Sequence, residues 1–167
     1  KSTLLSRISR ARPKIADYPF TTLVPNLGTV ALSGFRRFVV ADIPGLIEGA
    51  HEGAGLGDTF LRHIERTRII LHLVDLFPME GQLNPTTAYH TIRRELEKYS
   101  PTLAGKRELI VANKLDLAGR DDPPEMEDLG RELGARVMGI SAVSGRGIEA
   151  VVNQLWRMLE EEKAAPG

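Results

Sequence analysis

The stretch Leu109–Asp116, which reads LIVANKLD, decides the fold. Its first four residues form an apolar run of strand length, and polar residues follow at once. Two other strand-like runs end in the same way: Phe35–Ala41 precedes Asp42, and Arg136–Ile140 precedes Ser141. Helical patterns alternate with these short runs, which is typical of an α/β domain with a mostly parallel, twisted sheet and helices on both faces. Ligands of such open sheets bind beyond the carboxyl ends of the strands, where these polar residues would meet.

Composition bounds the class of protein. The chain has 167 residues, which is enough for one domain with a sizeable core. Lys and Arg total 22, as do Asp and Glu, and this balance weakens the case for sequence-blind nucleic-acid binding without excluding a local basic patch. Cysteine is absent, which excludes disulfides, thiol nucleophiles and Cys-based zinc sites. No run approaches the roughly 20 apolar residues of a membrane span, and no signal peptide is visible. We therefore expect a soluble, cytoplasmic protein without membrane contact.

Periodicity predicts the order of the elements. A hairpin is expected at Ser33-Gly34, a loop at Lys14–Val24, and a helix cap at Asn84-Pro85. The predicted strands are residues 27–32, 35–41, 69–74, 109–112 and 136–140. The predicted helices are residues 2–12, 58–66, 86–99, 122–133 and 147–162.

The polar end of LIVANKLD suits a guanine base. The carboxylate of Asp116 can accept two parallel hydrogen bonds, and guanine offers two adjacent donors, its ring N–H and its exocyclic amine. Adenine would leave that carboxylate unpaired. The stem of Lys114 can cover the base, and Asn113 can tie neighbouring loops together. After the last strand, a backbone N–H of Ser141-Ala142-Val143 can donate to the guanine carbonyl oxygen. The alternative is a surface turn with a helix-capping Asp.

Two further segments suit phosphate and magnesium. Asp42-Ile43-Pro44-Gly45 places a carboxylate that can hold Mg²⁺ through water, and a glycine whose N–H can approach a terminal phosphate; the alternative is an ordinary strand-ending turn. Lys1-Ser2-Thr3 matches the end of a phosphate-binding loop that opens a helix. The glycines of such a loop would precede Lys1, and the chain has no initiator Met, so we expect it to be cut from a longer polypeptide.

Two other patterns are not sites. Gly53, Gly55 and Gly57 have the spacing G-x-G-x-G without a leading strand, which argues against a dinucleotide site and favours a loop that reorders with ligand over a plain flexible loop. The four histidines, at positions 51, 63, 72 and 90, lack metal-ligand spacing.

Taken in order, these elements resemble a P-loop GTPase. More narrowly, Tyr18–Gly28 (YPFTTLVPNLG) and Asp42–Ala50 (DIPGLIEGA) resemble the Obg (CgtA) family of bacterial GTPases. The resemblance covers essentially the whole chain. It implies a P-loop NTPase three-layer fold, with a GTP-binding domain over residues 1–163 and the start of a linker at 164–167. The first strand and the phosphate-loop glycines would lie upstream, so we expect these 167 residues alone to fold poorly and not to hold phosphate.

The resemblance also implies a role for each motif. Lys1, Thr22 and Gly45 would be catalytic, with Thr22 sensing the γ-phosphate; Ser2, Thr22 and Asp42 would hold Mg²⁺. The first switch would span residues 20–24, and Asp42 and Gly45 would head the second. The nucleotide-binding set is Lys1, Ser2, Thr3, Phe20, Thr21, Thr22, Leu23, Val24, Asp42, Ile43, Pro44, Gly45, Asn113, Lys114, Leu115, Asp116, Ser141, Ala142 and Val143.

One departure changes the expected mechanism. Leu46 stands where a water-positioning Gln follows Asp-x-Pro-Gly in Ras-like GTPases, which predicts slow intrinsic hydrolysis. Similar GTPases use K⁺, so K⁺ joins Mg²⁺ and GTP/GDP as an expected ligand. The resemblance implies a monomeric switch in large ribosomal subunit assembly and sensitivity to (p)ppGpp. One alternative is a nucleotide-gated ribosome- or RNA-binding module in which hydrolysis is incidental; another is an ATP-using P-loop enzyme, which Asn113–Asp116 disfavours.

Overall fold

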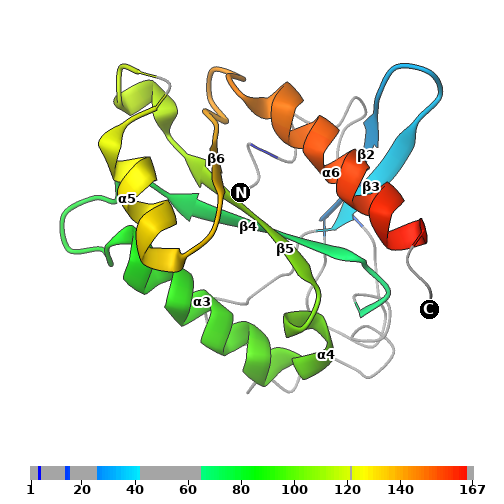
Figure 1. The fold of residues 1–167 in the computed structure, drawn as a ribbon, viewed down its shortest axis with the longest axis horizontal. Helices are drawn as coiled ribbons and strands as arrows, with labels where there is room; N and C mark the ends of the chain where they lie inside the picture. The colour runs from blue at the N-terminus through cyan, green and yellow to red at the C-terminus, as the bar shows by residue number, and fades with distance from the viewer. Residues whose placement is uncertain (1–3, 5–13, 16–25, 42–64, 121, 165–167) are drawn as a thin grey trace.

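The computed structural model describes residues 4, 14–15, 26–41, 65–120 and 122–164. Short strands alternate with helices along this part of the chain (Figure 1). The strands are β1 (Lys14–Ile15), β2 (Asn26–Ala31), β3 (Arg37–Ala41), β4 (Ile69–Asp75), β5 (Arg107–Asn113) and β6 (Val137–Gly139). The helices are α3 (Pro85–Tyr99), α4 (Pro101–Ala104), the 3₁₀ turn η3 (Leu115–Leu117), α5 (Pro124–Leu133) and α6 (Ile148–Ala164). The predicted helices at 2–12 and 58–66 lie almost wholly outside the described residues.

The six strands form two three-stranded sheets. One is parallel, in the order β4-β5-β6, and the other is antiparallel, in the order β1-β2-β3. The expectation of a mostly parallel sheet thus holds for β4–β6, whereas β2 and β3 form the predicted hairpin, with Ala31 opposite Arg37. A loop this short cannot cross over, so the two strands run antiparallel. Lys14–Ile15, expected to be loop, pairs with the start of β2.

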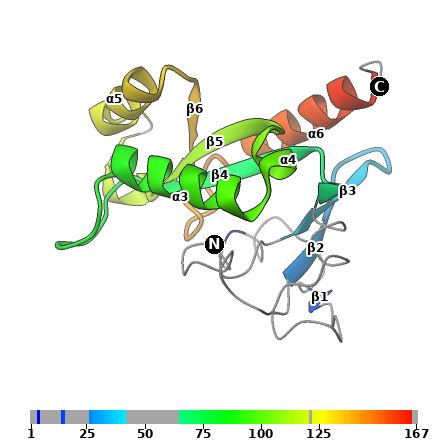
Figure 2. The ribbon, with the colours of Figure 1, turned by 90° about the horizontal axis from the view of Figure 1, so that it is seen from below.

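Helices cover both faces of the parallel sheet, which confirms the predicted α/β architecture. Side chains alternate along β5: Leu109 and Val111 join the core cluster of α6, and Ile110 and Ala112 join the cluster that contains Leu129 of α5. Figures 1 and 2 show α6 on one side of the sheet and α3 and α5 on the other. The sheet is therefore the middle of three layers.

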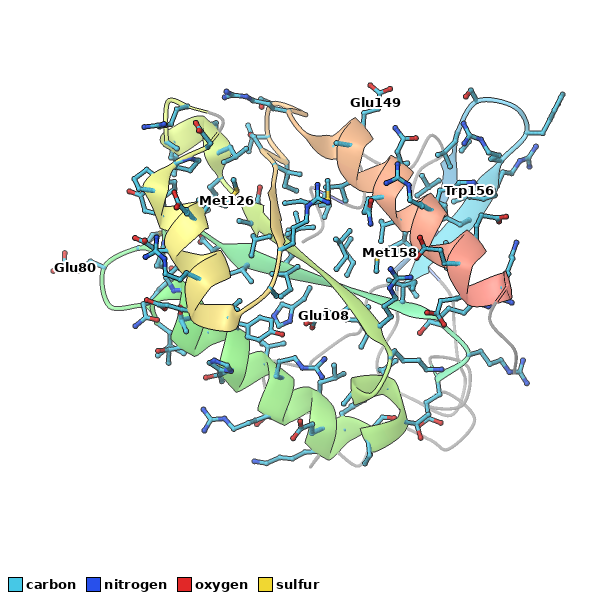
Figure 3. All side chains as sticks on the ribbon, in the orientation of Figure 1. Glu80, Glu108, Met126, Glu149, Trp156 and Met158 are labelled. Carbon is cyan, nitrogen blue, oxygen red and sulfur yellow. The ribbon has the colours of Figure 1, made fainter. Side chains whose placement is uncertain are left out.

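Helix α6 also packs on the β2–β3 hairpin. Val30, Phe38 and Val40 of the hairpin join the core cluster of α6. Trp156 of α6 lies toward the hairpin (Figure 3), and the guanidinium of Arg36 lies 5.8 Å from its ring centroid. The hairpin and the parallel sheet thus share α6 as a common packing partner.

A polar cluster is built into the layer between the parallel sheet and α3. His72 of β4 is buried; its Nδ1 lies 3.1 Å from Oε2 of Glu108, and its ring stacks on Tyr89 at 4.5 Å. Tyr89 Oη donates to Oε1 of Glu108 at 2.6 Å, and Arg93 Nη1 donates to Oε2 at 3.3 Å. Figure 3 places Glu108 between the strands and α3. Burial raises the pKa of Glu108, but the hydrogen bonds from His72 and Tyr89, together with the electrostatic attraction of His72 and Arg93, outweigh burial and lower that pKa below its usual value. Burial, followed by the bond to Glu108, raises the pKa of Tyr89 to about 12. His72 is thus part of a buried structural network with Glu108 and Tyr89.

None of the helices in the described ranges is long and apolar enough to cross a membrane. Within the same ranges, His, Cys, Asp and Glu side chains nowhere gather in a group of three that could hold a metal ion.

Candidate functional site

The predicted site lies where the three parallel strands end. Asp75 is the last residue of β4 and stands opposite Asn113, the last residue of β5. Past these ends the ladders continue, because Leu76 N–H donates to Asn113 O at 3.2 Å and Ile140 N–H donates to Ala112 O at 2.8 Å. In Figure 1 the arrows of β4 and β5 both point toward the side of the sheet where α5 lies. The backbone therefore fixes where each following polar side chain begins.

Asn113 joins the ends of β5 and β6. Its Oδ1 accepts a hydrogen bond from the N–H of Ala142 at 3.0 Å, which is the tie between neighbouring loops that the sequence predicts. The same bond occupies the Ala142 amide, one of the groups expected to reach a guanine carbonyl. A ligand would have to take this donor from Asn113, or use another N–H of the loop.

Lys114 adopts a left-handed backbone conformation, with φ of 79° and ψ of 32°. A residue with a Cβ takes this conformation at a cost of roughly 1–2 kcal/mol. Two bonds hold it there: Leu115 N–H donates to Ile140 O at 3.0 Å, and Leu117 N–H donates to Lys114 O at 3.0 Å. The Lys114 Nζ then lies 2.7 Å from Oδ2 of Asp75.

Asp75 lies beside the predicted site residue Lys114 but is not among the residues that the sequence predicts. It follows an apolar strand, which is the same signal that singled out Asp42. Its ion pair with Lys114 depends on the left-handed backbone of Lys114. This conformation could not be predicted from the sequence, because the residue is not a glycine.

A buried hydroxyl, that of Ser141, holds the carboxylate of Asp116 through a hydrogen bond. Ser141 is 0% exposed, and its Oγ donates to Oδ1 of Asp116 at 2.8 Å while accepting from Ser144 N–H at 3.1 Å. Asp116 itself is exposed. A carboxylate oxygen has two lone pairs, so Oδ1 can accept a second donor from a ligand. Between Lys114 and Asp116, the Leu115 side chain is buried in the core, which leaves only its backbone for a ligand.

The loop after β6 is closed by its own backbone. Ser141 N–H donates to Arg146 O at 2.9 Å, and Gly145 N–H donates to Ser141 O at 2.8 Å. Gly147 has φ of +78°, and a Cβ there would lie 2.3 Å from Gly139 O. Only glycine fits, so this residue fixes how closely the loop returns to β6.

Residues 1–114 match the family model described as 50S ribosome-binding GTPase. The chain belongs to this GTPase family. Its relatives include the GTPase Obg of Aquifex aeolicus, 54% identical over 162 residues, and that of Thermosipho africanus, 50% identical over 164 residues. These alignments take in 96% and 98% of this chain but 47% and 37% of the relatives, so the chain spans less than half their length. They confirm the resemblance to the Obg family.

Solved structures confirm the fold of this GTPase domain. The G domain of the T. maritima FeoB iron transporter superposes with a TM-score of 0.61 at 18% identity, over 92% of this chain and 87% of that one. The cytosolic domain of L. pneumophila FeoB gives a TM-score of 0.61 at 21% identity, over 92% and 63% of the two chains. At these low identities, the similarity concerns the fold alone.

Val143, the last predicted residue of the loop after β6, is exposed. The remaining predicted site residues lie outside the described residues. They are the phosphate and magnesium segments and the two switches: Lys1, Ser2, Thr3, Phe20–Val24, Asp42–Gly45 and Leu46. The donor set proposed for Mg²⁺, two hydroxyls and one carboxylate, consists of the hard oxygen ligands that this ion prefers, so the residue types fit it.

Proposed function

We propose that this chain binds guanine nucleotides and hydrolyses GTP to GDP and phosphate, as a slow, monomeric molecular switch in the cytoplasm. The observation that carries the proposal is the carboxylate of Asp116, which is exposed in the turn η3 after β5 and held by the buried hydroxyl of Ser141. A fixed carboxylate at this sheet edge matches the two adjacent donors of guanine. It has no match in adenine, and a site built this way rejects the wrong partner by about 10⁴–10⁵.

Each neighbouring residue has a part in the proposed recognition. The stem of Lys114 covers a face of the base, and Asn113 holds the loop of Ser141 against the end of β5. The bonds that hold Asn113 and Asp116 lie within the chain itself, which limits the freedom that these side chains lose on binding. Affinity then comes with a smaller entropy cost on binding.

The phosphate end is assigned from sequence. Lys1 would bind the β- and γ-phosphates, Thr22 and Gly45 would contact the γ-phosphate, and Ser2, Thr22 and Asp42 would hold Mg²⁺. A bound Mg²⁺ neutralises charge that develops on the phosphates. Leu46 cannot orient water, so hydrolysis by the domain alone is slow; K⁺ or a partner would supply the missing group.

The partner we propose is the large ribosomal subunit, during its assembly, with (p)ppGpp as a competing nucleotide. The family description names 50S binding, and the relatives are Obg GTPases. The second candidate function is a nucleotide-gated ribosome- or RNA-binding module. It is favoured by the tip of the β2–β3 hairpin, where Phe35 is 97% exposed and Arg37 is exposed beside it.

Single-turnover hydrolysis separates the two. GTP is mixed with an excess of the protein that carries this domain, with and without 50S subunits, in K⁺ or Na⁺ buffer. The switch predicts slow hydrolysis that subunits or K⁺ accelerate, since a charge-stabilising group supplied in trans gives about 10³–10⁵ in rate. Nucleotide-dependent binding to subunits without any acceleration would favour the binding module. Displacement of labelled GDP by ATP as well as by GTP would contradict guanine specificity.

A further inference from the structure

We infer that Asp75 is a positioning residue for nucleotide binding: it holds the ammonium of Lys114 so that the lysine stem is already laid out where a purine face docks. The inference rests on the proposed function, because it concerns the same site. In this role Asp75 acts on the nucleotide through Lys114.

The sheet register brings the two residues together. Asp75 stands directly opposite Asn113, so Lys114 begins one residue beyond the end of β5. Lys114 has a left-handed backbone, and its side chain extends to the end of β4, where Nζ lies 2.7 Å from Oδ2 of Asp75. Register and turn together thus set this contact.

Asp75 is itself oriented by its own chain. Its Oδ1 accepts a hydrogen bond from Phe77 N–H at 2.9 Å, while Oδ2 faces the lysine. The side chains of Asp75 and Lys114 are 38% and 35% exposed, so the pair lies at the surface that a ligand reaches. The Asp75 carboxylate therefore binds the backbone after β4 with one oxygen and the ammonium of Lys114 with the other.

The consequence concerns affinity more than base selectivity. A free lysine stem has several rotatable bonds, and ordering them on binding costs entropy that a held stem has already lost. The stem packs on the face of a base, and every purine has that face, whereas Asp116 reads the edge. Loss of Asp75 should then weaken GDP and IDP by the same factor.

Two variants isolate the ion pair. Asp75→Asn keeps an oxygen for Phe77 N–H and removes the charge, and Lys114→Met keeps an apolar stem and removes the ammonium. Asp128→Asn is the matched control, because Asp128 makes a comparable surface ion pair with Arg131 on α5. All variants are made in the protein that carries this domain, and their thermal unfolding is compared first.

The experiment is a double-mutant cycle on equilibrium binding of fluorescent mant-GDP and mant-IDP at low and high salt. Half-exposed ion pairs are screened and modest, so we expect Asp75→Asn to weaken both nucleotides about three- to fivefold at low salt and less at high salt. We expect no further loss when Asp75→Asn is added to Lys114→Met, and no change with Asp128→Asn.

Three results would overturn the inference: wild-type affinity in Asp75→Asn, losses that multiply in the double variant, or an equal loss in Asp128→Asn. A shift in the GDP-to-IDP ratio would also contradict it, because the lysine would then read the base edge. If the wild-type protein binds no mant-GDP, the proposed function fails as well. If it does bind and Asp75→Asn is unchanged, only the inference fails.

Discussion

Replacing Ser141 by Ala removes the hydroxyl that holds Asp116, and the loss can be worked out from its two bonds. A hydrogen bond to a charged group contributes about 1.5–3 kcal/mol, and a neutral one about 1 kcal/mol. Asp116 is exposed, so water replaces its lost donor and the low end applies, while the Ser144 N–H also loses its acceptor. Together these cost about 2.5 kcal/mol of folding free energy, which lowers Tm by about 5–10 °C for a domain of this size.

The affinity for GDP tests the role of Ser141 separately from the stability of the fold. Without the hydroxyl, the carboxylate of Asp116 must be ordered by the ligand, and we expect GDP to bind about tenfold more weakly, equivalent to about 1.4 kcal/mol. Mant-GDP titration, well below the Tm of both proteins, measures this. Ser144→Ala is the matched control: the Ser144 hydroxyl accepts from Arg146 N–H and does not touch Asp116. GDP affinity within twofold of wild type in Ser141→Ala, or an equal loss in Ser144→Ala, would refute the reasoning.

Three other outcomes follow from the structure and sequence. Gly147→Ala places a Cβ 2.3 Å from Gly139 O and should lower Tm by about 4–12 °C, from about 2–3 kcal/mol of strain and clash. The control is Gly119→Ala, which has the same left-handed strain, because φ of Gly119 is +70°, but whose Cβ meets nothing within 4 Å; equal melting curves of the two variants would contradict the clash. The pKa of Glu108 is lowered on folding, so its contribution is present above the unfolded pKa and is lost as pH falls through the folded one; urea unfolding from pH 7 to pH 3 should show a shallower acid loss in Glu108→Gln than in wild type. Thr22→Ala should spare GDP and impair Mg²⁺-GTP binding or turnover in nucleotide titrations and single-turnover assays, and wild-type turnover with GTP would count against the role of Thr22.

The strands that carry the site were predictable because burial leaves a plain pattern. Leu109–Ala112 is apolar throughout and lies between two helical layers, as a central parallel strand should. The expected cap at Asn84 is confirmed, since its Oδ1 accepts from Thr87 N–H at 2.8 Å at the start of α3. Apolar runs and helix caps involve residues close together in the sequence, so the sequence alone predicts them.

The contacts that the sequence did not predict depend on strand register or on strained backbone conformations. The contact of Asp75 with Lys114 needs both the pairing of β4 with β5 and a left-handed lysine. His72 interrupts the apolar run of β4 in the sequence, and its contact with Glu108 follows only from the pairing of β4 with β5. Phe35, expected to start a strand, instead sits in the hairpin turn with φ of 62°, and β3 begins at Arg37.

Equilibrium binding of GDP, XDP and ADP to wild type and to Asp116→Asn tests the central claim most directly, namely that Asp116 reads a guanine edge. Wild type should bind GDP far more tightly than XDP or ADP. Because two charge-assisted bonds of about 1.5–3 kcal/mol each are lost, Asp116→Asn should weaken GDP by about a hundredfold or more. It should bind XDP more tightly than wild type does, since an amide can donate to the extra carbonyl of xanthine. Unchanged GDP affinity in Asp116→Asn, or ADP binding as tight as GDP in wild type, would contradict the account.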